Sequence, residues 1–391
     1  MSGLPRGLLP VLAGANFVIG AGAFLVIGAL APISRDLGLT PAQAGWILTT
    51  YALAYAVLSP LLVSLTGGIG RRRVMTLGMV LFGLGALGSA LAPSAGGLLA
   101  ARVVAAAGAG LTTPVTAAVA ALLSAPEMRG KVLAYVFMGI TLAGVIGVPG
   151  GSWIAYTYGW RTAFWAVAVL SAVFAVVLWL RVPAGLRFQP VRLRDLGGVL
   201  GDWKLMLAIG FTAVFLAAIY VPFTYLAPLL EARMGLGRDG VTVALLIAGL
   251  GGVAGNLVGG WLSDRLGPYA TLLWLCGAQA ALMPLLSLLP IPLGLAFLLL
   301  LAWNAAGFAF NSSQQIRVVV LAGARAPVAL ALNAACIYVG AAIGSALGAG
   351  VIDGFGLSAL GVAGGITVLA AVAALVLSQR LTPVDRGASG A

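Results

Sequence analysis

Few side chains in this sequence could carry acid–base or metal chemistry. The 391 residues include nine Asp and Glu, two Cys and no His. Hydrolytic and metal-assisted reactions usually need a histidine, paired carboxylates or a metal cluster. Cys276 and Cys336 lie in apolar stretches without a histidine to help bind a metal, so we expect neither a disulfide nor a metal site. We therefore predict that the protein is not an enzyme and uses no cofactor.

The chemistry that remains is hydrogen bonding by uncharged polar groups within apolar runs. Asn304, Asn311 and Gln315 recur at a spacing that places them on one face of a helix. Similar groups in the other runs are Asn16, Tyr51, Tyr55, Tyr220, Thr224, Tyr225, Asn256, Asn333 and Tyr338. A cavity lined by amides and aromatic rings suits a neutral, hydrogen-bonding, partly planar solute. Such groups also bond one membrane helix to another, and the sequence leaves both roles open.

One charge, Arg102, falls inside an apolar run. A charged side chain at the centre of a bilayer costs roughly 2.5–3.5 kcal/mol or more, so Arg102 should face a cavity or a partner. Asp36 is the nearest plausible acid, and otherwise Arg102 could bind an electron-rich or anionic group of a substrate. The alternative is an arginine that reaches the membrane interface or binds backbone carbonyls.

Long apolar helices must position these groups. The chain is 62% hydrophobic and 8% charged, with a mean hydropathy of +1.12. Runs of about 20 apolar residues match the thickness of a bilayer, where helices satisfy their own backbone groups. The short alternating segments of a β-barrel are missing from the sequence. We predict an all-α membrane protein with twelve transmembrane helices, at Leu8–Pro32, Ala42–Leu65, Val74–Ala92, Gly97–Leu123, Val132–Tyr156, Ala163–Leu180, Leu205–Leu230, Val241–Leu262, Ala270–Leu289, Leu293–Ile316, Val328–Ile352 and Leu357–Leu377.

The positive charges lie between these runs, which argues against a nucleic-acid partner and for a topology signal. With both termini in the cytoplasm, 16 Lys and Arg, Arg317 among them, lie inside and four outside. Five of the inner ones are Arg181, Arg187, Arg192, Arg194 and Lys204. We predict a six-helix half at residues 1–180, a cytoplasmic linker at 181–204 and a second six-helix half at 205–391. The expected partners are the lipid bilayer and a small-molecule substrate, with the protein a monomer.

The two halves repeat one pattern. Leu65-Thr-Gly-Gly-Ile-Gly-Arg-Arg-Arg73 and Gly260-Trp-Leu-Ser-Asp-Arg-Leu-Gly267 each follow the second span of a half, and such duplication is typical of secondary transporters. The second segment resembles the loop signature of the major facilitator superfamily, G-x-L-[AS]-D-R-x-G. Together with Gly147-Val-Pro-Gly-Gly151, Gly159-Trp-Arg-Thr-Ala-Phe164 and Gly255-Asn-Leu-Val-Gly-Gly260, it is similar to the drug:proton antiporter branch with twelve spans, especially the arabinose-efflux-like and purine-efflux-like permeases.

The resemblance implies two pseudo-symmetric halves that work by alternating access in a bacterial-type inner membrane. It implies a conformational latch at Asp264, Arg265, Gly267 and Arg71, and packing or gating by Gly147, Pro149 and Gly151. Arg102 fits an arginine of the family's fourth span, and spans 1, 4, 7 and 10 would line the cavity. The expected task is export of a sugar, a nucleoside or purine, or an amphenicol-type drug.

Two departures from the family pattern bear on mechanism. Gly67 stands where the first-half signature would have its aspartate. No Asp or Glu falls deep in an expected span, whereas proton antiporters of this branch usually carry one in an early span. The alternatives are therefore a uniporter without proton coupling, an importer of a small polar solute, or a non-transporting membrane sensor.

Overall fold

The computed structural model describes residues 7–125, 128–186 and 193–382. Several charged residues of the topology argument lie outside these ranges: Arg6, Glu127, Arg187, Arg192, Asp385 and Arg386, and the side chains of Arg194 and Asp195 are not described either. The chain forms two compact units, unit 1 (Met1–Leu39 and Thr50–Val191) and unit 2 (Thr40–Thr49 and Arg192–Ala391). The expected halves differ from these units at Thr40–Thr49, which group with unit 2.

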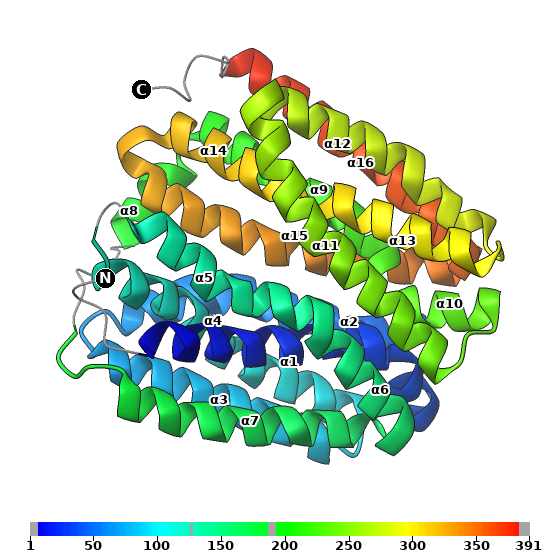
Figure 1. The fold of residues 1–391 in the computed structure, drawn as a ribbon, viewed down its shortest axis with the longest axis horizontal. Coiled ribbons are helices and arrows are strands. Elements are labelled where there is room, and N and C mark those ends of the chain that lie inside the picture. Colours follow the sequence, from blue (N-terminus) through cyan, green and yellow to red (C-terminus); the bar gives the residue numbers. More distant parts are fainter. Residues whose placement is uncertain (1–6, 126–127, 187–192, 383–391) are drawn as a thin grey trace. The chain divides into compact units, whose positions relative to one another are not determined.

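Unit 1 is a bundle in which α1 and α3 are the central packing elements. α3 packs against α4 and α7, and α1 packs against α4, α5, η2, α6 and α7 (Figure 1). The elements are α1 (Leu8–Leu37), α2 (Pro41–Leu65), α3 (Arg71–Leu91), α4 (Ala95–Leu122), α5 (Arg129–Leu142), the π-helical turn η2 (Ala143–Gly147), α6 (Val148–Tyr158) and α7 (Trp160–Arg181).

Unit 2 begins with a short helix from the expected linker and continues as a second bundle. α9 packs against α15 and α16, and α11 packs against α13 and α14. The elements are α8 (Leu193–Leu200), α9 (Trp203–Phe223), α10 (Leu226–Met234), α11 (Arg238–Leu266), α12 (Pro268–Leu282), η3 (Met283–Leu288), α13 (Leu293–Phe308), α14 (Phe310–Ala322), η4 (Gly323–Arg325), α15 (Ala326–Phe355), η5 (Leu357–Ala359) and α16 (Leu360–Leu381).

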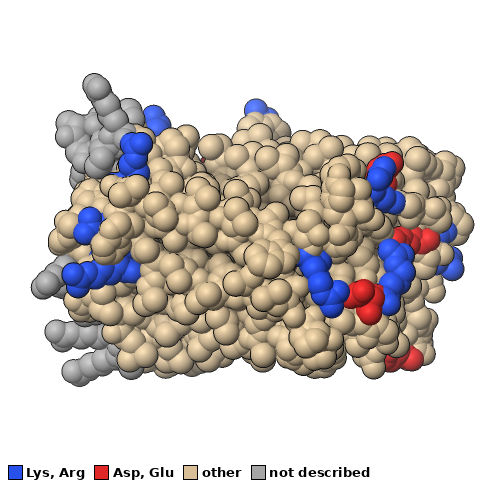
Figure 2. Space-filling model, turned by 90° about the horizontal axis from the view of Figure 1, so that it is seen from below, with Lys and Arg blue, Asp and Glu red and all other residues tan. Residues whose placement is uncertain are grey.

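Twelve helical stretches in the described ranges are long and apolar enough to cross a membrane, which confirms the predicted fold class. Much of the surface in Figure 2 is uncharged, with Lys, Arg, Asp and Glu gathered towards its ends. Most helices extend beyond the apolar runs. The largest difference at a single helix end is in the tenth stretch, which continues to Ala322 rather than ending at Ile316. Arg317, which we counted as an inner loop charge, therefore lies within this helix.

Small residues allow α11 to approach α13 and α14 at backbone distance. A methyl group on Gly251, Gly255 or Gly259 would overlap the carbonyl oxygen of Leu301, Ala305 or Ala309, respectively. Each glycine thus meets the residue 50 positions later, so the helices run parallel in a constant register. Close approach of this kind is what glycine permits between membrane helices.

Candidate functional site

Arg102 of α4 is enclosed in unit 1, with 1% of its surface exposed. Its Nη1 donates to the Gly22 carbonyl at 2.9 Å and its Nη2 to the Ala23 carbonyl at 2.7 Å, both on α1. The guanidinium also lies over the Tyr51 ring, 4.3 Å from the centroid. Of the roles left open by the sequence, this geometry supports carbonyl binding, which ties α4 to α1.

Asp36 is engaged elsewhere and is not the partner of Arg102. Its carboxylate accepts a hydrogen bond from the Trp160 indole at 3.1 Å and forms an ion pair with Arg161. Arg161 also donates to the Ala92 carbonyl at 3.1 Å. These contacts join the ends of α1, α3 and α7, so the Gly159–Phe164 segment singled out in the sequence has a structural role here.

Asn16 is another buried polar residue of unit 1 among the expected residues. Its amide nitrogen donates to the Thr116 hydroxyl at 3.0 Å and to the Val136 carbonyl at 3.3 Å, linking α1, α4 and α5. The Asn16 Oδ1 and the Thr113 hydroxyl make no hydrogen bond within the described ranges. Tyr51 and Tyr55 are both buried, with ring centroids 6.5 Å apart.

In unit 2, aromatic rings from α9 and α13 meet amides from α12 and α13. Tyr220, Phe223 and Trp303 form successive edge-to-face pairs, with centroids 5.6 and 5.9 Å apart. The Gln279 amide nitrogen donates to the Trp303 carbonyl at 2.9 Å, and Asn304 follows Trp303 on α13. We call Tyr220, Gln279, Trp303 and Asn304 the α9–α13 cluster.

The α9–α13 cluster has hydrogen-bonding capacity left over. The Gln279 Oε1, the Trp303 Nε1 and the Asn304 Oδ1 are buried and have no hydrogen-bond partner in the part of the chain described. Asn304 uses its nitrogen only for the Leu300 carbonyl one turn earlier, at 3.0 Å. A buried polar group without a partner is destabilising by about 1–3 kcal/mol, so three together indicate a role beyond packing.

A separate polar network joins α9, α14 and α15. The Asn333 Oδ1 accepts from the Thr212 hydroxyl at 2.6 Å and from the Gln314 amide at 3.3 Å, and Gln314 also donates to the Ala208 carbonyl at 2.8 Å. Sequence reasoning found Asn333 but missed Thr212 and Gln314. Each is a polar residue inside an apolar run, which was the available signal.

Asn304, Asn311 and Gln315, which we expect on one helix face, differ in burial. Asn304 is buried, whereas Asn311 is half-buried and accepts a hydrogen bond at 3.0 Å from the exposed Gln315. The segment divides at Ala309, where α13 ends and α14 begins. Gln314 is buried in place of Gln315.

Two other expected residues have internal partners. The Thr224 hydroxyl donates to the Tyr220 carbonyl at 2.8 Å, a bond within the same turn of chain. The Tyr225 hydroxyl donates to the Ser345 carbonyl of α15 at 2.7 Å, and its ring fills the space beside Gly348. Both side chains are fully buried, and the structure gives them packing contacts.

The expected latch residues differ in their surroundings. Arg71 is buried, and its side chain donates to the Gly67 carbonyl at 3.4 Å. Gly267 has a φ of 81° and joins α11 to α12, a conformation that favours glycine. Arg265 lies over Trp261 at 4.2 Å, while Asp264 is exposed and has no ion pair within the described ranges.

Gly147, Pro149 and Gly151 surround the junction of η2 and α6. Proline lies in the first turn of α6, where its missing N–H is tolerated. Methyl groups at Gly147 and Gly151 would overlap Ala21 and Leu25 of α1. The motif therefore brings this broken helix against α1, as close packing requires, and its part in gating stays a prediction.

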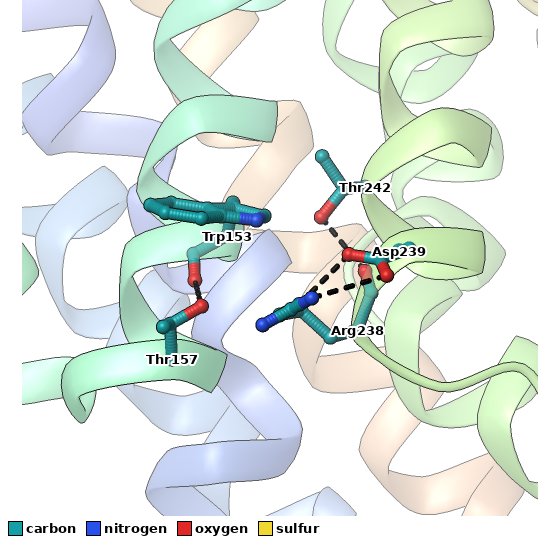
Figure 3. Close-up of polar contacts among 5 residues, drawn as sticks. All are labelled: Trp153, Thr157, Arg238, Asp239 and Thr242. Atoms are coloured by element: carbon teal, nitrogen blue, oxygen red, sulfur yellow. Dashed lines mark hydrogen bonds and ion pairs between the residues drawn. The ribbon is translucent and has the colours of Figure 1, made fainter.

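The carboxylates of the described ranges are at helix ends and in connections, and none is buried. At the start of α11, Asp239 pairs with Arg238 at 2.7 Å, and the Thr242 hydroxyl donates to the Arg238 carbonyl (Figure 3). In unit 1, the Thr157 hydroxyl likewise donates to the Trp153 carbonyl at 2.7 Å (Figure 3). Across residues 7–125, 128–186 and 193–382, no group of three His, Cys, Asp or Glu could hold a metal.

These features define a polytopic helical membrane protein of two bundles. The model of the Major Facilitator Superfamily matches residues 12–326, and the chain belongs to this family of transporters. It is 32% identical to the uncharacterized MFS-type transporter YtbD of Bacillus subtilis, over 97% of this chain and 96% of that one. It is 34% identical to a chloramphenicol resistance protein of Streptomyces lividans, over 86% of each.

Solved structures agree on the fold. A bacterial homolog of the human lysosomal transporter Spinster, in an inward-facing and unoccupied conformation, matches with a TM-score of 0.74 at 20% identity, over 95% of this chain and 96% of that one. The twelve helices and the bacterial relatives indicate a multi-pass inner-membrane protein.

Proposed function

We propose that this transporter exports a small, neutral, partly planar solute of the amphenicol kind by alternating access. The observation that carries the proposal is the α9–α13 cluster, in which three buried polar atoms have no partner in the part of the chain described. The relatedness to a chloramphenicol resistance protein supports export of this solute class. Sugars, nucleosides and purines share part of the same hydrogen-bonding chemistry.

The hydrogen-bonding groups of the α9–α13 cluster are complementary to those of such a solute. Trp303 offers an N–H donor, whereas Gln279 and Asn304 offer carbonyl acceptors. An amphenicol has hydroxyl and amide groups to satisfy them and an aryl ring to pack against Tyr220 and Phe223. The cluster is enclosed in the described conformation, so a solute would reach it when the helices part, as alternating access requires.

The mechanistic alternative is a uniporter. Proton antiport needs a group that takes up and releases a proton in the membrane, and none of the described Asp and Glu side chains is buried. Import of a small polar solute uses the same recognition groups in the other direction. Uptake of chloramphenicol into proteoliposomes, measured with and without a pH gradient, separates these cases.

Binding is tested by heating the purified protein with chloramphenicol, a nucleoside and a sugar. A ligand that binds only the folded state stabilises it by about 2.7 kcal/mol at 100 times its Kd. We expect chloramphenicol to raise the unfolding midpoint and Asn304→Leu to abolish the shift. Gln315→Leu is the matched control, because Gln315 is an exposed amide on the same segment. Equal shifts in both variants, or no shift with chloramphenicol in the unmodified protein, would contradict the proposal.

A further inference from the structure

Arg317 is a buried cation that the proposed recognition chemistry does not use. It lies on α14 of unit 2, with 0% of its surface exposed. Its Nη2 donates to the Ser378 hydroxyl of α16 at 2.8 Å. Its Nε and Nη1 make no hydrogen bond within the described residues. A guanidinium has five N–H donors in a planar fork that fits a carboxylate, so this side chain lacks an anion.

The other groups near Arg317 are also hydrogen-bond donors. Ser313 lies one turn earlier on α14, and its buried hydroxyl has no hydrogen-bond partner in the part of the chain described. α11 continues alongside α14, where a β-carbon at Gly260 would lie 3.9 Å from the Ser312 hydroxyl, and Ser263 lies about one turn further along α11. The Ser263 hydroxyl is buried and unbonded in the same way. Donors therefore gather where the signature segment passes α14.

One anion in the chain lies next to this place. Asp264 follows Ser263 directly and, among the described residues, has neither a hydrogen bond nor an ion pair. The helix that follows Gly267, α12, packs against α14, which carries Arg317. Tyr269, two residues after Gly267, interacts electrostatically with Arg317. Asp264 thus lies in the chain between Ser263 of α11 and Tyr269, which interacts with Arg317.

We propose that Arg317 is the intramolecular partner of Asp264, and that the two form an ion pair in the transport conformation in which the signature segment closes onto α14. In the conformation described here Asp264 is exposed, and Arg317 is buried with no acidic partner among the described residues. A buried charge that lacks its counter-ion is strongly unfavourable, whereas the paired charges offset that penalty. Two alternative arrangements of one segment are the kind of bistable element that switching proteins use.

The proposal makes Arg317 a positioning residue. It would hold Asp264 and the turn at Gly267 in one of two positions, without contacting the substrate. It identifies Arg317, in the same unit, as the partner of the Asp264 carboxylate in the latch expected from the sequence. The pairing needs no substrate, so a failure of the proposed amphenicol specificity would leave it standing.

The first test is proximity in membranes. In a chain whose two native cysteines are replaced by alanine, Asp264→Cys is combined with Arg317→Cys and, separately, with Ser313→Cys, which preserves the arginine. Gly260→Cys with Ser312→Cys is the matched positive control, because a β-carbon at Gly260 would lie 3.9 Å from the Ser312 hydroxyl. We expect oxidation to crosslink both test pairs. If the control crosslinks and neither test pair does, the proposal is overturned.

The second test is energetic coupling. Asp264→Asn, Arg317→Gln and the double variant are purified in full length and heated. An ion pair predicts that the double variant shifts the midpoint by less than the two single shifts combined, and that Arg317→Lys keeps most of the coupling. Arg265→Gln, which neutralises a neighbouring exposed charge, should show no coupling with Arg317→Gln. Additive shifts for Asp264 and Arg317 would overturn the pairing.

Discussion

Arg102 in unit 1 and Arg317 in unit 2 are both almost fully enclosed in their bundles, and the two are held in different ways. Arg102 in unit 1 donates to two carbonyls of α1 and is covered by Tyr51. Arg317 in unit 2 donates to one hydroxyl, and two of its nitrogens have no hydrogen-bond partner in the described ranges. Neither has a buried acid beside it in those ranges.

This difference indicates that Arg102 has a structural role, whereas Arg317 can change its partner when the protein changes conformation. Arg102 fixes the position of α4 against α1, because its bonds are to backbone that cannot leave without moving a helix. Arg317 bonds to a side-chain hydroxyl, which leaves its charge largely uncompensated. A group in that condition favours any rearrangement that supplies an anion. The comparison therefore predicts opposite effects on stability when each charge is removed.

The largest expected effect comes from Arg102→Leu. This change removes two hydrogen bonds from a charged donor, and we expect the free energy of unfolding to fall by about 3 kcal/mol. The measurement is denaturant unfolding of the purified protein in mixed micelles. Arg73→Leu, at an exposed arginine of the same unit, should change it by less than about 0.5 kcal/mol. Equal stability of the Arg102 variant and the native protein would remove the structural role.

Arg317→Leu should have the opposite sign. Replacing an unpaired buried charge with an apolar side chain is often stabilising. We expect the free energy of unfolding to rise by about 2 kcal/mol in the same measurement. Transport should nevertheless fall, because the Asp264 carboxylate would lose the guanidinium that donates to it. A loss of stability comparable to that of Arg102→Leu would show that Arg317 is structural as well, and the comparison between the units would break.

Gly259→Ala tests the register on which the position of Arg317 depends. The added methyl group would overlap the Ala309 carbonyl, which is backbone and cannot rotate away. Overpacking of this kind should lower the free energy of unfolding by about 1.5 kcal/mol and reduce the crosslinking of Gly260→Cys with Ser312→Cys. Gly260→Ala is the control, since its methyl group meets only the Ser312 hydroxyl at 3.9 Å. Similar results for both variants would contradict the register.

The sequence predicted the twelve helices well because the apolar runs are long and the charges lie between them. It failed at Arg317, where a charge was taken as the end of a span although Val318 to Ala322 continue the helix. Hydropathy penalises an arginine in the same way whether it faces water or the interior of a bundle. It did not distinguish the buried Gln314 from the exposed Gln315, because adjacent amides in one apolar run give the same local signal. The pairing of Arg102 with α1 carbonyls depended on tertiary contact that no spacing encodes.

The smallest effect on stability is expected at Arg325, an arginine that forms an ion pair with an acidic residue. Asp202 at the start of α9 pairs with Arg325 at 2.7 Å and accepts from the Leu205 N–H at 3.2 Å. The hydrogen bond from Arg325, and then that from Leu205, hold the pKa of Asp202 below its ordinary value of 3.8. Because the pKa of Asp202 is lower in the folded than in the unfolded protein, its ion pair stabilises the fold fully at a pH above the ordinary pKa. This stabilisation is lost as pH falls through the lowered pKa of the folded state.

Both partners are partly exposed, so Arg325→Gln should lower the free energy of unfolding by only about 0.5 kcal/mol at pH 7. The deficit should shrink in high salt and should be lost as pH falls through the lowered pKa of Asp202. Arg317→Gln changes a cation without an acid partner in the described residues, so its effect should not follow this acid titration. Unfolding curves for the two variants at pH 7 and at a series of lower pH values make the contrast direct, and a deficit for Arg325→Gln that does not fall with pH would mean that its bond to the Gly198 carbonyl, at 3.1 Å, outweighs the ion pair.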